Sequence, residues 1–135
     1  MTTSILDINL DDREELKVLP DNAEVNLRIT RAELTPNKND PSRNNLALTF
    51  DVPSDPLVDD IRVWIPIPNA AGREEDPKKY TKQVNRVAEF CSAFKIKLPM
   101  DVTRMSGLTA WAILREEPGM NGEPQNSVRR FIAGK

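Results

Sequence analysis

Flat rings beside cationic side chains are the residues of this sequence best suited to chemistry with a partner. From Asp60 to Pro68 apolar residues alternate with others, so a regular strand turns Arg62 and Trp64 to one face, opposite the core. Binding to a single-stranded nucleic acid needs cations along the phosphates and rings on which bases stack. Arg62 and Trp64 are therefore the first candidates for such a site.

Two more rings and several more cations extend this candidate site. Trp111 lies in a run whose two faces are both apolar enough to be core, so the direction of its ring stays open. Phe131 follows Arg129 and Arg130 and is a candidate stacking ring. The further candidate cations lie on or near predicted strands, in the first loop between strands, or at the start of the predicted helix: Arg28, Lys38, Arg43, Lys78, Lys79, Arg115 and Arg129.

The residues that most enzymes and metal sites need are missing or badly spaced. The chain has no histidine, one cysteine and five glycines, and none of the glycines belongs to a nucleotide-binding loop. This excludes histidine-dependent triads, His-ligated metals, thiolate zinc clusters and internal disulfides. The carboxylate runs at 59–60 and 74–76 lack the spacing of a calcium loop. We therefore expect no catalysis, no metal and no cofactor.

Charge is distributed unevenly along the 135 residues. The net charge is −2, but residues 1–24 hold seven acids and two bases, whereas the rest hold 17 bases and 14 acids. Local potential, more than net charge, steers a polyanion. We expect an acidic N-terminal arm over residues 1–20, whose apolar residues within 5–10 could pin it to the body, and one domain over residues 21–135. The sequence has no apolar run of membrane-spanning length and no signal peptide, so a cytoplasmic protein is expected.

Sequence periodicity predicts five strands and one helix. The predicted strands are residues 24–34, 46–52, 60–68, 108–115 and 127–132, and the predicted helix is residues 77–94. Asp76 is the expected N-cap and Pro77 the first helical residue, after a loop over residues 69–76. Asn121-Gly122 suits a two-residue primed hairpin turn before the last strand.

The apolar stripe of the predicted helix indicates how it packs. Its expected buried residues are Tyr80, Val84, Val87, Ala88, Cys91 and Phe94, with Phe50 and Phe90 also in the core. Lys78, Lys82, Arg86 and Glu89 are expected on the solvent side. The β-β-β-α-β-β order is that of a mainly β, five-stranded OB-fold Greek-key barrel with its helix between strands three and four. A generic α+β sheet with one covering helix and a small sandwich are the rival topologies.

Several segments resemble the small phage-encoded single-stranded DNA-binding proteins, an OB-fold family. The matching segments lie between Leu6 and Phe131: LDINLDD, LP before the first strand, EVNLRITRAELTPNKN, LALTFDV, IRVWIPI, the helix QVNRVAEFCSAFKI and the closing GLTAWAILREEPGMNGEPQNSVRRF. The resemblance implies protection of single-stranded DNA, without sequence preference, during phage DNA replication or recombination in an infected cell. It implies replication or recombination proteins as partners and leaves a homodimer open.

The OB-fold also indicates where DNA would lie. Oligonucleotides bind OB-folds on the face of strands two and three, between the loops that join strands one to two and four to five. Arg62 and Trp64 are expected on that face, and Lys38 and Arg43 in the first of those loops. The alternative is a protein–protein adaptor, of OB or α+β fold, whose exposed Trp64 face docks another protein and binds no nucleic acid.

Overall fold

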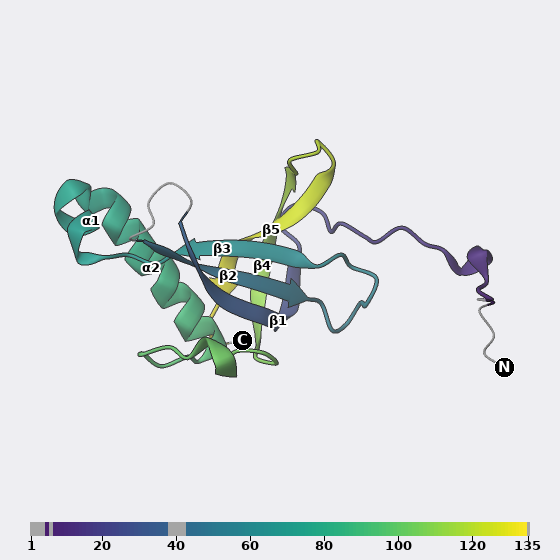
Figure 1. Ribbon diagram of the computed structural model, residues 1–135, viewed down its shortest axis with the longest axis horizontal. Coiled ribbons are helices and arrows are strands. Elements are labelled where there is room, and N and C mark those ends of the chain that lie inside the picture. The colour runs from purple at the N-terminus through teal and green to yellow at the C-terminus, as the bar shows by residue number, and fades with distance from the viewer. Residues whose placement is uncertain (1–4, 6, 38–42, 135) are drawn as a thin grey trace.

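Five antiparallel strands form one sheet in the order β3-β2-β1-β4-β5, with the main helix inserted between β3 and β4 (Figure 1). The computed structural model describes residues 5, 7–37 and 43–134. The elements are β1 (Glu24–Pro36), β2 (Asn44–Asp51), β3 (Ile61–Pro66), α1 (Ala70–Glu75), α2 (Pro77–Phe94), β4 (Thr109–Pro118) and β5 (Pro124–Ile132), with 3-10 turns at Leu10–Asp12 and Val102–Arg104. The fold is thus α+β, and all five predicted strands are confirmed, with shifted ends.

Strands β2 and β3 follow the period of two that their sequences predict. Leu46, Leu48 and Phe50 are buried and lie opposite Ile65, Val63 and Ile61, which are buried as well. Such alternation requires one face packed on a core and the other open to solvent. The outward residues of β3, Arg62 and Trp64, are both exposed, as predicted.

The start of α2 is the one that its sequence predicts. The Asp76 side chain accepts a hydrogen bond from the backbone N of Lys79 at 3.2 Å, and Pro77 is the first helical residue. The helix ends at Phe94, followed by Lys95 in the left-handed conformation with φ 58°. The loop predicted before it is wrong in part, because Asn69 caps the short helix α1 by accepting from Gly72 N at 2.9 Å.

Aromatic rings from three elements meet under α2. The Phe131 ring lies 5.4 Å from Phe90 and 5.9 Å from both Phe50 and Phe94. Phe90, Phe94 and Phe50 are buried, as the sequence predicts. Within the predicted stripe, Val84 and Ala88 are exposed and Tyr80 is only half-buried, so α2 packs on the sheet mainly through its C-terminal end, where Phe90, Ala93 and Phe94 are buried.

The sheet is not closed into a barrel, and side chains of α2 bind part of the free edge of β5. Arg86 donates to the carbonyls of Val128 at 2.7 Å and Arg129 at 3.2 Å. Glu89 accepts from Phe131 N at 2.6 Å. Since these backbone groups have partners on α2, β5 needs no ladder with β3, and none joins them in the described residues. The predicted closed barrel is thus an open sheet, and the placement of Arg86 and Glu89 on the solvent side is wrong.

We predict that replacing Glu89 by leucine destabilises the protein by about 1–3 kcal/mol, because Phe131 N then lacks an acceptor at a part-buried edge. The Arg86 guanidinium, 3.6 Å from Glu89, would also lose its counter-charge. Urea unfolding at neutral pH measures the loss. Glu89→Gln is the matched control, since it keeps an acceptor and should lose less; an equal loss in both would assign the effect to charge alone.

The β4–β5 hairpin differs from its predicted two-residue turn. Residues 119–123 separate the two strands, and Gly119 N donates to Glu123 O at 2.7 Å. A type I′ turn needs positive φ at both central residues, whereas Gly122 has φ 81° and Asn121 is not among the residues of positive φ. Both strands extend further toward the turn than predicted, because β4 ends at Pro118 and β5 begins at Pro124. The hairpin projects from the sheet (Figure 1).

Residues 17–19 tie the N-terminal arm to the body. Lys17 N donates to Leu57 O at 2.8 Å, and Asp59 N donates to Lys17 O at 2.9 Å. The Asn126 side chain accepts from Leu19 N at 2.8 Å and donates to Leu19 O at 2.9 Å. Residue 5 and residues 7–16 are exposed, and the arm extends away from the sheet (Figure 1). These hydrogen bonds hold the arm at residues 17–19, whereas residues 5 and 7–10, for which apolar contacts were predicted, are exposed; residue 6 lies outside the described residues. No helix in the described residues could cross a membrane.

Candidate nucleic-acid interface

The outer face of β1, β2 and β3 carries two adjacent rows of side chains. In the first row, Trp64 lies opposite Ala47, which lies opposite Glu33. In the second row, Arg62 lies opposite Thr49, which lies opposite Arg31. Small residues on the middle strand leave space between the long side chains of the two outer strands.

Trp64 stands between two hollows. The first, of about 490 Å³, lies over the two rows and extends to Thr35 and Asp60. The second, of about 410 Å³, lies between β3 and the β4–β5 hairpin and is lined by Met120 and Gln125. Arg62 and Trp64 line both, so we call the two hollows together the Trp64 groove. The Trp64 side chain is 60% exposed, so a flat ligand can reach its ring.

The charges of the Trp64 groove are mixed. Arg62 is exposed beside Trp64, and Arg31 makes a long ion pair, 3.5 Å, with Glu33. Glu33 and Asp60 bring carboxylates to the same hollow. An exposed pair of this length contributes little to stability, so Arg31 can turn to another anion.

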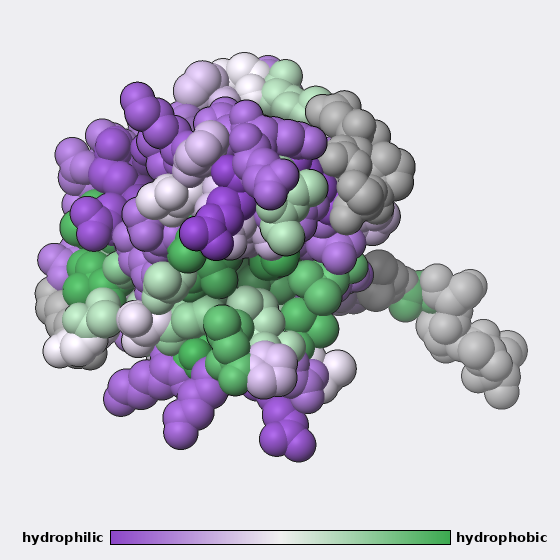
Figure 2. All heavy atoms as spheres, turned by 90° about the vertical axis from the view of Figure 1, so that its left-hand side faces the viewer, coloured by the Kyte–Doolittle hydropathy of each residue, from purple (hydrophilic) through white to green (hydrophobic). Residues whose placement is uncertain are grey.

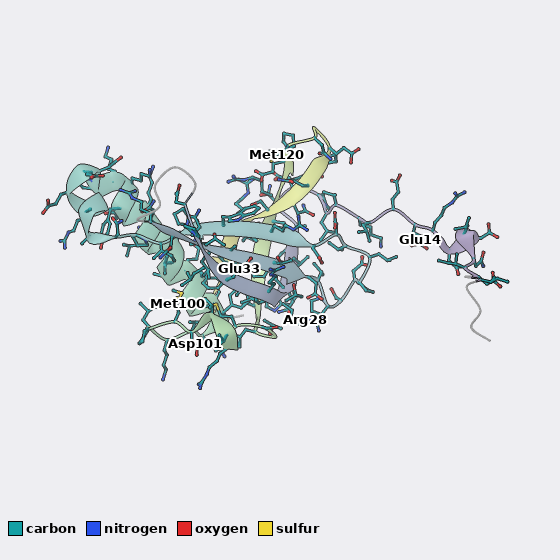
Figure 3. The ribbon with its side chains drawn as sticks, in the orientation of Figure 1. Glu14, Arg28, Glu33, Met100, Asp101 and Met120 are labelled. Carbon is teal, nitrogen blue, oxygen red and sulfur yellow. The ribbon has the colours of Figure 1, made fainter. Side chains whose placement is uncertain are left out.

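Arg28 has a partner already. It donates to both carboxylate oxygens of Asp51, at 3.0 and 2.5 Å, and this hydrogen bonding raises the pKa of the guanidinium. Figure 3 shows Arg28 low on the sheet and Met120 at the hairpin above it. Of the predicted cations, Arg28 therefore binds within the protein and lies away from the hairpin side of the Trp64 groove.

Trp111 points outward but lies far from Trp64. Its neighbours on β4 face the core: Ala110, Ala112 and Leu114. Trp111 is half-buried and lies opposite Asn26 of β1, whereas the Trp64 row meets β1 at Glu33. These two points are separated by about 23 Å along the strand. Trp111 therefore is not part of the Trp64 groove.

Phe131 is buried, 3% exposed, so its predicted role as an accessible stacking ring is wrong. The reason is a register shift: Ile113 pairs with Arg130, but Leu114 pairs with Val128, which leaves Arg129 as an extra residue in β5. A bulge of this kind reverses the alternation beyond it. Val128 and Phe131 consequently both face the core, with the Arg86 guanidinium 4.8 Å from the Phe131 ring centroid.

Two of the predicted cations near the helix, Arg43 and Lys79, line a different depression. Arg43 is ion-paired with Glu75 of α1 at 3.2 Å. It lines a small hollow of about 100 Å³ together with Lys79 and Tyr80. Lys78 and Lys79 are exposed on the first turn of α2. Lys38 lies outside the described residues.

Arg129 and Arg115 lie near the turn that precedes β1. Arg129 donates to both oxygens of Asp21 at 3.1 and 3.2 Å, while exposed Arg115 adds positive charge near the same carboxylate. The backbone N of Glu116 also donates to Asp21, at 3.0 Å, and this bond is the main cause that lowers the pKa of Asp21. Arg129 thus binds the turn to β5, so its guanidinium is already engaged in an ion pair within the protein.

We predict that acid destabilises the protein partly through Asp21. Its pKa is lowered on folding from the ordinary value of 3.8, so its contribution is present above that unfolded pKa and is lost as pH falls through the lower folded value. Thermal unfolding between neutral and strongly acidic pH measures this. Asp21→Asn should lower stability at neutral pH and flatten the decline below about pH 4; an unchanged acid decline would contradict the assignment.

Sequence reasoning missed part of the groove. Arg31, Thr49, Met120 and Gln125 line it but were not predicted as site residues. The pairing of β1 with β2 brings Arg31 and Thr49 beside Arg62, and strand pairing is not visible in a single strand's period. Met120 lies in the loop that joins strands four and five, and in OB-folds this loop borders the binding site. That position is the one feature of the sequence that could have identified Met120 as a site residue.

The rest of the described surface shows no metal centre. No group of three or more carboxylate or thiol side chains gathers in the described residues. Cys91 is half-buried on α2, and burial raises the pKa of its thiol, which makes it a poor nucleophile.

No protein-family model and no curated protein matches this sequence.

Proposed function

We propose that this protein binds and protects single-stranded DNA without catalysis and without sequence preference, during phage DNA replication or recombination in the cytoplasm of an infected cell. Replication or recombination proteins would be its partners. The observation that carries the proposal is the exposed Trp64 ring beside Arg62, between two hollows on one continuous face. Bases would stack on the ring while Arg62 and Arg31 contact phosphates.

The strand order supports an OB-fold in its partly open form. The order β3-β2-β1-β4-β5 with a helix between β3 and β4 is what remains of a five-stranded Greek-key barrel when β3 and β5 do not pair. The Trp64 groove then lies on the β2–β3 face, with the β4–β5 hairpin beside it. This is the face with which OB-folds bind oligonucleotides.

Tryptophan fluorescence during titration with oligo-dT tests the proposal. The chain has two tryptophans, so Trp111→Phe leaves Trp64 as the sole reporter and Trp64→Phe is the matched control. We expect quenching in Trp111→Phe and little change in Trp64→Phe. Oligo-dT binding with quenching only in Trp64→Phe would place DNA at Trp111 instead, and no binding would refute the function.

Salt and strandedness give a second prediction. Affinity for oligo-dT should fall steeply between low and physiological salt, because phosphate contacts release counterions. Single-stranded DNA should outcompete duplex, since only unstacked bases can reach the ring. Competition measured by fluorescence anisotropy would contradict base stacking if duplex and single strand bound equally.

A protein–protein adaptor is the second candidate, and one observation favours it. Glu33 and Asp60 lie in the Trp64 groove, where they repel phosphates but not a basic peptide. Fully exposed Met120 adds an apolar contact of a kind common at protein interfaces. In the titration, this candidate predicts no response to oligo-dT.

A further inference from the structure

The segment after α2 encloses an apolar hollow with a cationic rim. The hollow measures about 250 Å³; its cations are Lys95, Lys97 and Arg104, and its apolar residues include Ile96, Met105 and Leu108. Leu98, between two lining residues, is 69% exposed. Figure 2 shows an apolar area with hydrophilic side chains projecting below it at the bottom of the molecule, the level at which this segment lies in Figure 1. We call this site the basic hollow.

The charge of the basic hollow is largely uncompensated. Asp101 is its one lining carboxylate within the described residues, and it accepts from Thr103 N at 3.0 Å and from Thr103 Oγ1 at 2.6 Å. It also lies 3.5 Å from Arg104. No ion pair involves Lys95 or Lys97 in the part of the chain that the structure describes. The site therefore suits a ligand that is both acidic and apolar.

The N-terminal arm has that composition. Over residues 7–16 it carries five carboxylates and one guanidinium, and every residue is exposed. Ile8, Leu10 and Leu16 are between 57% and 69% exposed. These apolar side chains, interspersed with carboxylates, complement the apolar wall and the cations of the basic hollow.

We propose that the arm of one copy of this chain docks into the basic hollow of a second copy. The arm leaves the body at Lys17, which is bound to residues 57–59, and extends outward. Figure 3 shows Glu14 far out on the arm, whereas Met100 and Asp101 lie beneath the end of α2, well separated from it. The geometry therefore favours a neighbouring molecule over the arm's own body.

The two docking surfaces are different parts of the chain, so the contact is heterologous. Heterologous contacts join copies head to tail, either in closed rings or in open chains that leave a free arm and a free hollow at the two ends. The rim pairs are solvent-exposed, so association should weaken as salt rises. This association does not depend on DNA binding, and either proposal can fail alone.

Sedimentation velocity of the full chain, over a range of concentrations at low and high salt, tests the proposal. The hollow variant carries Lys97→Glu with Arg104→Glu, and the arm variant carries Asp11→Lys with Asp12→Lys. The control Lys78→Glu with Lys82→Glu makes the same charge change on exposed positions of α2. We expect concentration-dependent association at low salt, weakened at least tenfold by either variant and little changed by the control.

Mixing the two variants gives the sharpest result. The hollow variant keeps a native arm and the arm variant keeps a native hollow, so the mixture should regain the association that each variant alone has lost. A chain that stays monomeric at low salt overturns the proposal, as does a hollow variant that associates like the wild type or a control that fails equally. Amide NMR shifts at Lys97 and Arg104 in a monomeric chain, caused by the arm variant, would mean that the arm binds its own hollow.

Discussion

Replacing Phe131 by alanine is expected to destabilise the protein by about 3–5 kcal/mol, the range for removing a buried aromatic ring. The ring is 3% exposed and contacts Phe50, Phe90 and Phe94, so its removal leaves a cavity between α2 and the sheet. Arg86, 4.8 Å from the ring centroid, would lose its cation–π contact as well. Chemical denaturation followed by circular dichroism measures the loss.

Phe131→Leu is the matched control. Leucine keeps most of the apolar volume, so its loss should be clearly smaller than that of alanine. If Phe131→Ala folded with wild-type stability and bound oligo-dT more weakly, Phe131 would be an accessible ring. The assignment of a bulge at Arg129, which turns Phe131 to the core, would then be wrong.

Replacing Trp64 by alanine is expected to raise the dissociation constant for oligo-dT about five- to 150-fold. This corresponds to about 1–3 kcal/mol for one stacked base. Folding stability should hardly change, because the side chain is 60% exposed and lies on the face opposite the core. Anisotropy titration gives the affinity, and urea unfolding gives the stability.

Trp64→Phe and Trp111→Ala are the controls for this prediction. Phenylalanine retains a smaller stacking face and should lose less affinity than alanine. Trp111 lies opposite Asn26, outside the Trp64 groove, so its replacement should affect affinity less. If Trp64→Ala unfolded the protein or left oligo-dT affinity unchanged, the stacking mechanism at Trp64 would be refuted.

Strands β2 and β3 and the start of α2 follow from their sequences, whereas β1 has an unpredicted bulge between Ile29 and Arg31. In β2 and β3 one face is apolar and the other polar, so a period of two is enough to bury Phe50 and expose Trp64. Asp76 and Pro77 determine where α2 begins, because capping and a fixed proline φ act within one turn of helix. These signals are local, and the fold leaves them intact.

The C-terminal half was decided by tertiary contacts. One extra residue in β5, Arg129, exchanges the two faces of the strand beyond it and buries Phe131. No residue type in β5 predicts that bulge. Arg86 and Glu89 have a composition typical of a solvent-exposed helix face, yet they bind the β5 edge and leave the sheet open. The sequence by itself determined which residues could form the Trp64 groove. Only the tertiary structure decided which of them meet there, because strand register and edge pairing depend on residues far apart in the chain.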